Sequence, residues 1–371
     1  MEKNNLVQLR PKFDYVLLIA ISILVFVGIL MVYSSSYPVG IREMGDGLYF
    51  FKRHLTFVAL GIFAIIVCRI IPMSVFQKYS GVLWVLSFLL CCVPFALGQF
   101  KNTYRWIRLG GFSMQPSDFL KISAALYFPK ILDTEANFKY PIYKHIISLG
   151  FIMLNAGLVY AQKDLSTAIV IAAVLFVMYF STTMKLGEIV IYAVVAPLVI
   201  YSIASKGFRS NRLAAFKDPY SIKLNGGWQI LQGIYAVANG GLWGVGIGNS
   251  IQKYFYLYAA YSDYAFAILC EELGFVRAAM ILLLYVFIAF RLIKHATSML
   301  DTFSSTFLIG IAAYIGLQSM IHMAVVVNAI PSTGITLPFI SYGGTSTLSF
   351  FIMVGLAFNV LKSSPRKVKS I

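Results

Sequence analysis

The sequence predicts an all-α polytopic membrane protein, with about ten transmembrane helices in one integral membrane domain, residues 1–371. Of the 371 residues, 59% are hydrophobic and only 12% are charged. An ordinary soluble domain is roughly half apolar and roughly a quarter charged, so this class is excluded. Charge-free runs also recur along the chain, for example at residues 15–33, 79–97 and 165–184. At about 1.5 Å per residue, each run is long enough to cross a bilayer core of about 30 Å.

The apolar runs, taken in order, predict ten spans: residues 15–33, 54–71, 79–97, 117–132, 146–161, 165–184, 187–205, 263–290, 303–328 and 345–362. Three of these patterns are weak, because Lys121 interrupts the fourth run, the fifth run is short, and Glu271 and Glu272 interrupt the eighth. The first run follows a basic N-terminus but is too long for the apolar core of a signal peptide. We therefore expect it to be an uncleaved first helix.

Ten spans place both termini on one side of the membrane, and the distribution of Lys and Arg indicates which side. The short loops on the side of the termini carry more Lys and Arg than those on the opposite side. The loop of residues 206–262 is also basic, but long loops translocate largely regardless of their charge. We therefore expect cytoplasmic termini, an extracellular loop at residues 206–262, and a cytoplasmic tail at residues 363–371.

The chain is strongly basic, with 30 Lys and Arg against 14 Asp and Glu and a net charge of +16. On a membrane protein this charge favours anionic lipid head groups and phosphate-bearing ligands. The sequence contains no nucleic-acid reader motif, so we expect no nucleic-acid partner. The four cysteines, Cys68, Cys91, Cys92 and Cys270, lie in apolar stretches without metal-ligand spacing, and we expect them to be buried hydrophobic residues and no metal site.

Asp263 is the leading candidate for chemistry, because it ends a tyrosine-rich polar loop at the mouth of the eighth predicted span. Two interpretations are equally supported: a helix cap assisted by Ser262, or an ionised general base at the outer membrane surface. Glu271 and Glu272 lie about 12 to 13.5 Å further along a helix, which is too far to form a close acid pair with Asp263. We expect them to form polar pairs inside the bundle, with Arg277 as a candidate partner.

Cationic residues gather in the stretch from Lys101 to Lys121. Arg105 and Trp106 are expected at the outer interface, where an arginine can grip phosphate with a planar fork. An aromatic belt with snorkelling arginines explains the same spacing and is favoured by the spacing alone. Lys121 lies one turn inside a helix that opens at Pro116, and an intramembrane lysine usually faces a cavity or a partner acid.

The sequence also makes specific predictions about three further loops. Asp164, in QKDLSTA, is predicted to cap the helix that follows it. The glycines from Gly240 to Gly248 could cradle phosphate, but no strand precedes them, so tight backbone turns against the bilayer are favoured. Residues 228–237 predict a short interfacial helix. The irregular loop of residues 328–346 is expected to line a site, because such backbone needs cover at membrane depth.

Five stretches in order resemble the SEDS family of bacterial shape, elongation, division and sporulation proteins, represented by FtsW, RodA and SpoVE. They are RWI to Lys121 at residues 105–121, QKDLSTA at 162–168, the glycine stretch ending in QK at 240–253, SDYAFAILCEELG at 262–274, and PSTGITLPFISYGGTS at 331–346. RLAAFKDPY followed by GGWQ is more similar to the FtsW and SpoVE branch than to RodA.

This resemblance implies a peptidoglycan glycosyltransferase that polymerises lipid II into glycan strands at the outer face of the bacterial cytoplasmic membrane, for cell division, including a septal location, or for cell shape. It implies lipid II as substrate, and a class B penicillin-binding transpeptidase and other divisome or elongasome membrane proteins as partners. Asp263 corresponds to the essential acid of the glycosyl transfer. The chain departs from the family at Ala259 and Tyr261, which replace Glu and His, and at Asp118, Lys163 and His322, which replace Glu, Pro and Asn.

The implied reaction is attack of an acceptor sugar hydroxyl on the anomeric carbon of a lipid-pyrophosphate donor, with inversion. One carboxylate that accepts the hydroxyl proton is the minimum requirement, and we expect it to be Asp263. Arg105 and Lys121 are expected to hold the pyrophosphate, together with Lys253 or a divalent cation, Mg²⁺ or Mn²⁺. The remaining predicted substrate-binding residues are Trp106, Ser341, Tyr342, Gly343 and Gly344. The alternatives are a flippase for lipid-linked precursors and a non-catalytic scaffold for a transpeptidase.

Overall fold

The computed structural model of the chain describes residues 13–100, 103–109, 112–135, 141–183, 209–221 and 226–363. Its helices are α1 (Tyr15–Met44), α2 (Tyr49–Ile70), α3 (Met73–Leu97), α4 (Pro116–Glu135), α5 (Pro141–Ala161), α6 (Leu165–Thr183), α8 (Arg209–Lys217), α9 (Gly227–Gly240), α10 (Ala265–Ser298), α11 (Thr302–Val326) and α12 (Gly344–Ser363). Two short antiparallel strands, β1 (Ile107–Leu109) and β2 (Phe112–Met114), form a hairpin between α3 and α4.

Within the residues that the structure describes, seven helices are long and apolar enough to cross a membrane: α1, α2, α3, α6, α10, α11 and α12. The predicted all-α membrane fold is therefore confirmed, apart from the hairpin. Two of the three weak patterns correspond to helices outside this set. α5 has an apolar segment of only residues 145–161, and α4 contains Lys121. The predicted span at residues 187–205 lies outside the described residues.

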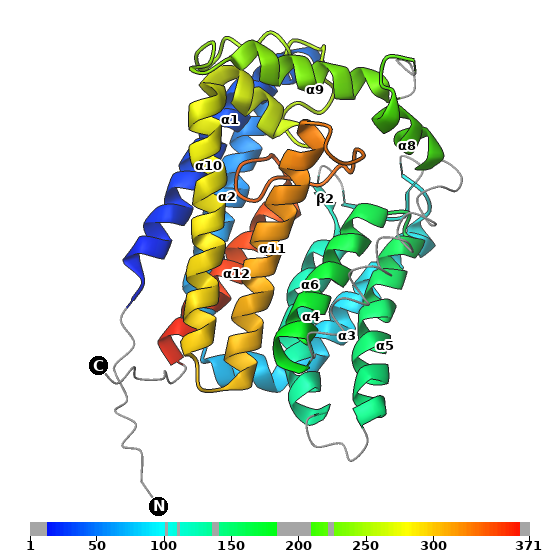
Figure 1. Ribbon diagram of the computed structural model, residues 1–371, viewed down its shortest axis with the longest axis vertical. Coiled ribbons are helices and arrows are strands. Elements are labelled where there is room, and N and C mark those ends of the chain that lie inside the picture. The colour runs from blue at the N-terminus through cyan, green and yellow to red at the C-terminus, as the bar shows by residue number, and fades with distance from the viewer. Residues whose placement is uncertain are drawn as a thin grey trace, which may run out of the picture.

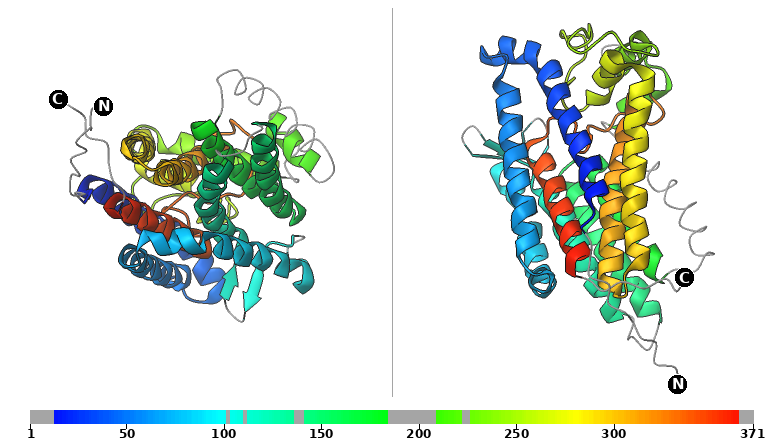
Figure 2. Two further views of the ribbon diagram at one scale, coloured as in Figure 1. Left: turned by 90° about the horizontal axis from the view of Figure 1, so that it is seen from below. Right: turned by 90° about the vertical axis from the view of Figure 1, so that its left-hand side faces the viewer.

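The long helices lie side by side in a bundle, and α9 crosses the end of the bundle at which α10 begins (Figure 1). α9 covers the interval in which residues 228–237 were expected to form a short interfacial helix, so the helix itself is confirmed. The first turn of α1 and the last turns of α12 lie at the opposite end of the bundle, as Figure 2 shows. There the rings of Phe13 and Phe358 stack with their centroids 5.1 Å apart.

Small residues bring α2 and α12 into close contact. A Cβ placed on Gly61 of α2 would lie 2.4 Å from the Phe351 ring, and one on Gly355 of α12 would lie 2.9 Å from Cys68. Close approach of this kind increases van der Waals packing between helices, which is a principal source of helix association in a bilayer. Side chains on every turn of α12 are buried. It therefore forms part of the interior against which the outer helices pack.

An ion pair joins α1 to α10 at the end of the bundle that holds Phe13. Asp14 caps α1 by accepting from the Leu17 N–H at 3.0 Å, and it accepts from Arg291 Nε at 2.6 Å. His295 Nε2 lies 2.5 Å from the same carboxylate. Burial alone would raise the pKa of Asp14, but the hydrogen bonds from Arg291 and His295 outweigh it and hold the pKa below its ordinary value.

A break in α10 receives the glycine-rich loop that follows α9. Gly274 has φ 79° and ψ 173°, so the helix is interrupted there, and the Val245 N–H donates to the Glu271 carbonyl at 3.0 Å. A Cβ on Gly240 would lie 2.0 Å from the Cys270 carbonyl oxygen, a distance that only glycine allows. The expectation of tight backbone turns is confirmed, and the packing surface is α10.

Candidate active site

Asp263 lies just before α10 but is not the residue that caps this helix. Tyr264 occupies the N-cap position, so Asp263 is one residue outside it. The side chain is half-buried, and its carboxylate faces Gly334 in the loop between α11 and α12: a Cβ placed on Gly334 would lie 3.4 Å from Asp263 Oδ2. Gly334 has φ +75°, which favours glycine. The irregular loop predicted to line a site therefore contacts Asp263.

The same loop fixes the backbone that leads into Asp263. Ser341 Oγ donates to the Ser262 carbonyl at 2.7 Å and accepts from the Leu337 N–H at 2.9 Å. The Tyr342 N–H donates to the Tyr261 carbonyl at 2.9 Å. Two of the predicted substrate-binding residues thus connect two loops and set the position of the catalytic candidate.

Aromatic rings surround this junction. Tyr261 stacks on Phe50 with ring centroids 4.9 Å apart, and the Tyr342 ring meets the Phe50 ring edge-on at 5.5 Å. Burial raises the pKa of both Tyr261 and Tyr342, so their phenols stay neutral. The glycines that follow are packed closely, since a Cβ would lie 3.1 Å from a Thr336 side-chain atom at Gly343 and 3.3 Å from the Phe57 ring at Gly344. The segment of residues 341–344 is therefore closely packed against its neighbours, with Ser341 buried and the other three residues half-buried.

Arg105 is paired with a helix cap. Its Nη1 lies 3.5 Å from Asp164 Oδ2, and Asp164 accepts from the Thr167 N–H at 3.1 Å and from Gln115 Nε2 at 3.1 Å. The predicted capping role of Asp164 is confirmed, and its second function is to orient Arg105. Arg105 is 29% exposed, and its Nε is buried without a hydrogen-bond partner among the described residues.

Lys121 has the partner acid expected of an intramembrane lysine. Its Nζ lies 3.0 Å from Asp118 Oδ1, and both side chains are buried. Thr345 Oγ1 donates to the other Asp118 oxygen at 2.9 Å and accepts from the Gln115 N–H at 3.2 Å. Because Gln115 also reaches Asp164, a continuous polar network runs from Arg105 to Lys121.

The loop that carries Gly334 is held on both sides. Ser166 Oγ of α6 donates to the Thr333 carbonyl at 2.9 Å. On the other side, His322 Nδ1 of α11 lies 2.6 Å from the Ile335 carbonyl, so this nitrogen carries the proton. These contacts fix the segment against which the Asp263 carboxylate rests.

Arg212 of α8 adds a second guanidinium to this region. Its Nη1 donates to the Ser332 carbonyl at 3.4 Å. Much of the side chain is exposed, yet protein atoms surround the guanidinium, and this burial together with Arg105 lowers its pKa, while Asp263 and Asp164 oppose the shift. Arg212 therefore lies within electrostatic reach of a second guanidinium, that of Arg105, and of two carboxylates, those of Asp263 and Asp164.

The hairpin places Trp106 beside this network. Trp106 is half-buried immediately before β1, and the Arg105 guanidinium lies 5.7 Å from its ring centroid. Arg108 lies over the Phe100 ring at 4.4 Å. The three-residue strands of the hairpin have too few residues for a periodic pattern, so the sequence predicted only a loop here.

Lys253 lies in a separate buried cluster. Its Nζ donates to Glu272 Oε1 at 2.9 Å, to Ser34 Oγ at 2.8 Å and to the Gly248 carbonyl at 2.6 Å, and the side chain is 3% exposed. Glu272 is about 13 Å along α10 from Asp263. The structure therefore does not bring Lys253 to the other predicted site residues, and its three donors are already used.

Glu271 ties down the loop that follows the glycine stretch. It accepts from the Ile251 N–H at 3.2 Å and from Ser250 Oγ. The expected polar pairing of the glutamates inside the bundle is confirmed, but Arg277 as their partner was wrong, since it donates to the Trp243 carbonyl at 2.7 Å. The partners were missed because they are distant in sequence: Ser250, Ile251 and Lys253 come from the loop before α10, and Ser34 comes from α1.

The part of the chain that the structure describes contains no group of three or more His, Cys, Asp or Glu side chains that could hold a metal ion. A divalent cation at this site would take most of its ligands from phosphate oxygens and water, as Mg²⁺ commonly does. Sequence reasoning missed Arg212 and Gly334. QKDLSTA and the irregular loop marked the regions around them, but the loop contacts that bring Arg212 to Asp263 leave no local pattern.

Comparisons with known proteins agree over nearly the whole chain. A sequence model of the cell cycle protein family FtsW/RodA/SpoVE matches residues 14–366. The chain is 34% identical to the probable peptidoglycan glycosyltransferase FtsW of Trichlorobacter lovleyi, over 95% of each protein. It is also 34% identical to the stage V sporulation protein E of Bacillus subtilis, over 95% of this chain and 97% of that protein.

Solved structures have the same fold. One chain of a peptidoglycan synthase complex that coordinates polymerization and crosslinking aligns with a TM-score of 0.77 at 22% identity, over 94% of this chain and 97% of that one. The rod shape determining protein RodA of Thermus thermophilus aligns with a TM-score of 0.70 at 20% identity, over 94% and 96% of the two chains.

Proposed function

The chain belongs to the FtsW/RodA/SpoVE family of cell cycle proteins, the SEDS family, and from this membership and the surroundings of Asp263 we propose that it is an inverting peptidoglycan glycosyltransferase. It polymerises lipid II at the outer face of the bacterial cytoplasmic membrane, for cell division, sporulation or cell shape. One observation carries the proposal: a half-buried carboxylate, Asp263, lies within electrostatic reach of the Arg212 guanidinium, which is in turn within reach of Arg105.

This arrangement supplies what the reaction needs. The acceptor sugar hydroxyl gives its proton to Asp263 as its oxygen forms a bond to the anomeric carbon of the donor. The bond from this carbon to the pyrophosphate oxygen breaks on the opposite face, which inverts the configuration, and the leaving oxygen keeps the electron pair. Arg105, whose side chain is partly exposed, and Arg212 stabilise the charge on the leaving pyrophosphate.

The other predicted residues have supporting roles in this scheme. Trp106 offers an aromatic face beside Arg105, against which a sugar ring can pack. Lys121 acts through Asp118 and the Gln115 network, which orients Arg105. Residues 341–344 position Asp263, and we leave Lys253 out of the substrate contacts because its donors are used by Glu272 and its neighbours.

The proposal keeps the ten-span topology. The seven long apolar helices, together with α4, α5 and the segment of residues 187–205, would give the ten spans. Both termini would then be cytoplasmic, and Asp263 would face the outside. The synthase complex of similar fold supports a transpeptidase as the partner. The relatives named FtsW and stage V sporulation protein E favour that branch of the family.

The test uses the purified full-length protein in proteoliposomes with lipid II and its transpeptidase partner. We expect glycan strands from the wild type and from Asp218→Asn, which removes an exposed acid on the segment after α8, and none from Asp263→Asn. Translocation of lipid II without polymer would favour the flippase. Polymer that forms equally with Asp263→Asn would favour the scaffold and contradict the proposed function.

A further inference from the structure

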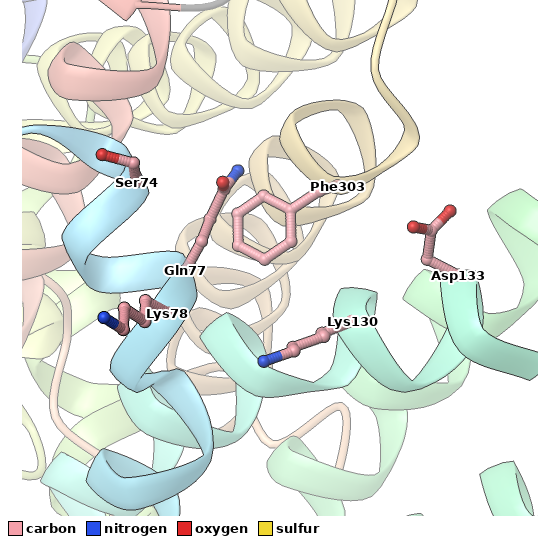
Figure 3. Close-up of a pocket in the computed structure, with 6 residues that line it drawn as sticks. All are labelled: Ser74, Gln77, Lys78, Lys130, Asp133 and Phe303. Atoms are coloured by element: carbon pink, nitrogen blue, oxygen red, sulfur yellow. The ribbon is translucent and has the colours of Figure 1, made fainter.

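Two adjoining hollows lie at the end of the bundle opposite Asp263. The first has a volume of about 330 Å³ between α3, α4 and α11, and Figure 3 shows its lining: Ser74, Gln77, Lys78, Lys130, Asp133 and Phe303. The second has a volume of about 570 Å³, and its lining includes Arg69, Ile70, Asp301, Asn359, Lys362 and Ser363. Ser74 and Gln77 on the first turns of α3 line both hollows, so the two are neighbours.

The lining of these hollows is cationic. Arg69, Lys78, Lys130 and Lys362 contribute four positive charges, against Asp133 and Asp301. Asp301 is engaged as the N-cap of α11, where its Oδ2 accepts from the Ser304 N–H at 2.9 Å. Lys78 and Lys362 are exposed, so each can reach a ligand at the mouth of the hollow that it lines, Lys78 at the first and Lys362 at the second.

The helix ends also favour an anion. α3 begins beneath both hollows with Pro72 at its N-cap and no side-chain acceptor for the N–H groups of its first turn. A helix N-terminus carries partial positive charge and binds phosphate readily. The C-terminal end of α2, which carries partial negative charge, also lies here. Asn359 Nδ2 donates to the carbonyls of Cys68 and Ile71 at 2.6 Å each, which offsets part of that charge.

An apolar surface leads away from the second hollow. Ile70, which lines it, is 71% exposed, and Ile66 and Phe63 continue the exposed face of α2 at 51% and 64%. A water-soluble phosphate has no apolar group to pack against this surface, whereas the acyl chains of a lipid would cover it. The phosphate of a membrane lipid also lies at the level where spanning helices end.

We propose that these hollows form a binding site for the phosphate head group of an anionic membrane lipid. Arg69 and Lys362 hold the phosphate over the N-terminus of α3, and an acyl chain follows Ile70 along α2. The site is separate from the Asp263 region and does not depend on the proposed function.

The test measures binding of phosphatidylglycerol to the full-length protein in detergent by native mass spectrometry, with phosphatidylcholine and glycerol phosphate as the other probes. We expect phosphatidylglycerol to bind more tightly than phosphatidylcholine, and glycerol phosphate not to compete. Lys362→Gln should weaken phosphatidylglycerol binding about tenfold, the effect of losing one charge-assisted contact. Lys294→Gln removes an exposed charge from the same end of the bundle, on α10 and outside the hollows, and should change binding by less than about twofold.

Equal losses in the two lysine variants, or equal binding of both lipids, would overturn the site in favour of general surface charge. Competition by glycerol phosphate would overturn the lipid as the source of the phosphate. Ser74→Trp provides an independent variant, because its ring fills the space common to both hollows. We expect it to abolish phosphatidylglycerol binding while the thermal stability stays that of the wild type, and retained binding would contradict the proposal.

Discussion

Lys253→Met removes one partner of a buried ion pair and tests whether this cation is structural. In the wild type the three Lys253 donors are satisfied by Glu272, Ser34 and the Gly248 carbonyl at 2.6 to 2.9 Å. The Glu272 side chain is fully buried; Lys253 and Ser34 both donate to its Oε1, and its Oε2 has no hydrogen-bond partner in the part of the chain that the structure describes. The variant would leave this carboxylate buried with only the Ser34 hydroxyl as donor.

The expected loss follows from this burial. Breaking a buried pair by removing one partner costs roughly 3–5 kcal/mol, because an uncompensated charge is left inside the protein. Replacing both partners removes that charge, so Lys253→Met/Glu272→Gln should recover at least half of the loss in the free energy of unfolding. The amide keeps an acceptor for Ser34 and carries no charge.

The assay is thermal unfolding of the full-length protein in nanodiscs, combined with a lipid II polymerisation assay on the fraction that stays folded. The single variant should unfold at a lower temperature, and the folded fraction should retain wild-type activity. A variant that keeps wild-type stability but loses polymerisation would refute this reasoning and return Lys253 to the substrate contacts.

Two further predictions concern Asp14 and Gly334. Asp14→Asn should lower the free energy of unfolding by roughly 2 kcal/mol at pH 7, because the Arg291 pair is lost. The lowered pKa of Asp14 means that this stabilisation is fully present above about pH 4 and declines progressively as the pH falls towards the depressed pKa of the folded state, so the gap between the two proteins should narrow steadily below about pH 4, and a gap that does not narrow would contradict the assignment. Gly334→Ala should slow polymerisation because its methyl would occupy the space beside the Asp263 carboxylate, at 3.4 Å from Oδ2, and would exclude substrate or water from it. Gly45→Ala carries similar backbone strain, at φ +70°, with nothing within 4 Å, and should leave the rate unchanged; equal rates for the two variants would contradict the positioning role.

The membrane helices could be predicted from sequence because charge-free runs of this length are typical of membrane spans and rare in soluble domains. Their ends were less predictable: α1 continues to Met44, beyond the predicted end at residue 33, since the polar turns after Tyr33 are still helical. The contacts that a polar residue makes inside a membrane helix depend on which other helices pack against it. Lys121 illustrates this, because its partner Asp118 is three residues away and predictable, whereas the contact of Asp118 with Thr345 is not.

The candidate site was also predictable in part, where a polar residue or an irregular segment interrupts an apolar pattern. Asp263 was conspicuous as an acid at the mouth of an apolar run, and the irregular loop at residues 328–346 was expected to line a site. The pairing of Lys253 with Glu272 could not be read from the chain, because the residues are 19 apart and meet only after the glycine stretch docks on the break at Gly274. Arg212 is held at the site by a hydrogen bond to the backbone carbonyl of Ser332. Every residue type has such a carbonyl, so no side-chain pattern in the sequence indicates this contact.

The central claim, that Asp263 takes the proton of the acceptor hydroxyl, is tested most directly by steady-state polymerisation kinetics of Asp263→Asn beside Asp218→Asn. If Asp263 is the general base, Asp263→Asn should lower kcat by about 10² to 10⁴-fold and leave the KM for lipid II near the wild-type value, whereas Asp218→Asn should match the wild type. A wild-type kcat for Asp263→Asn would contradict the claim, and so would a loss confined to KM.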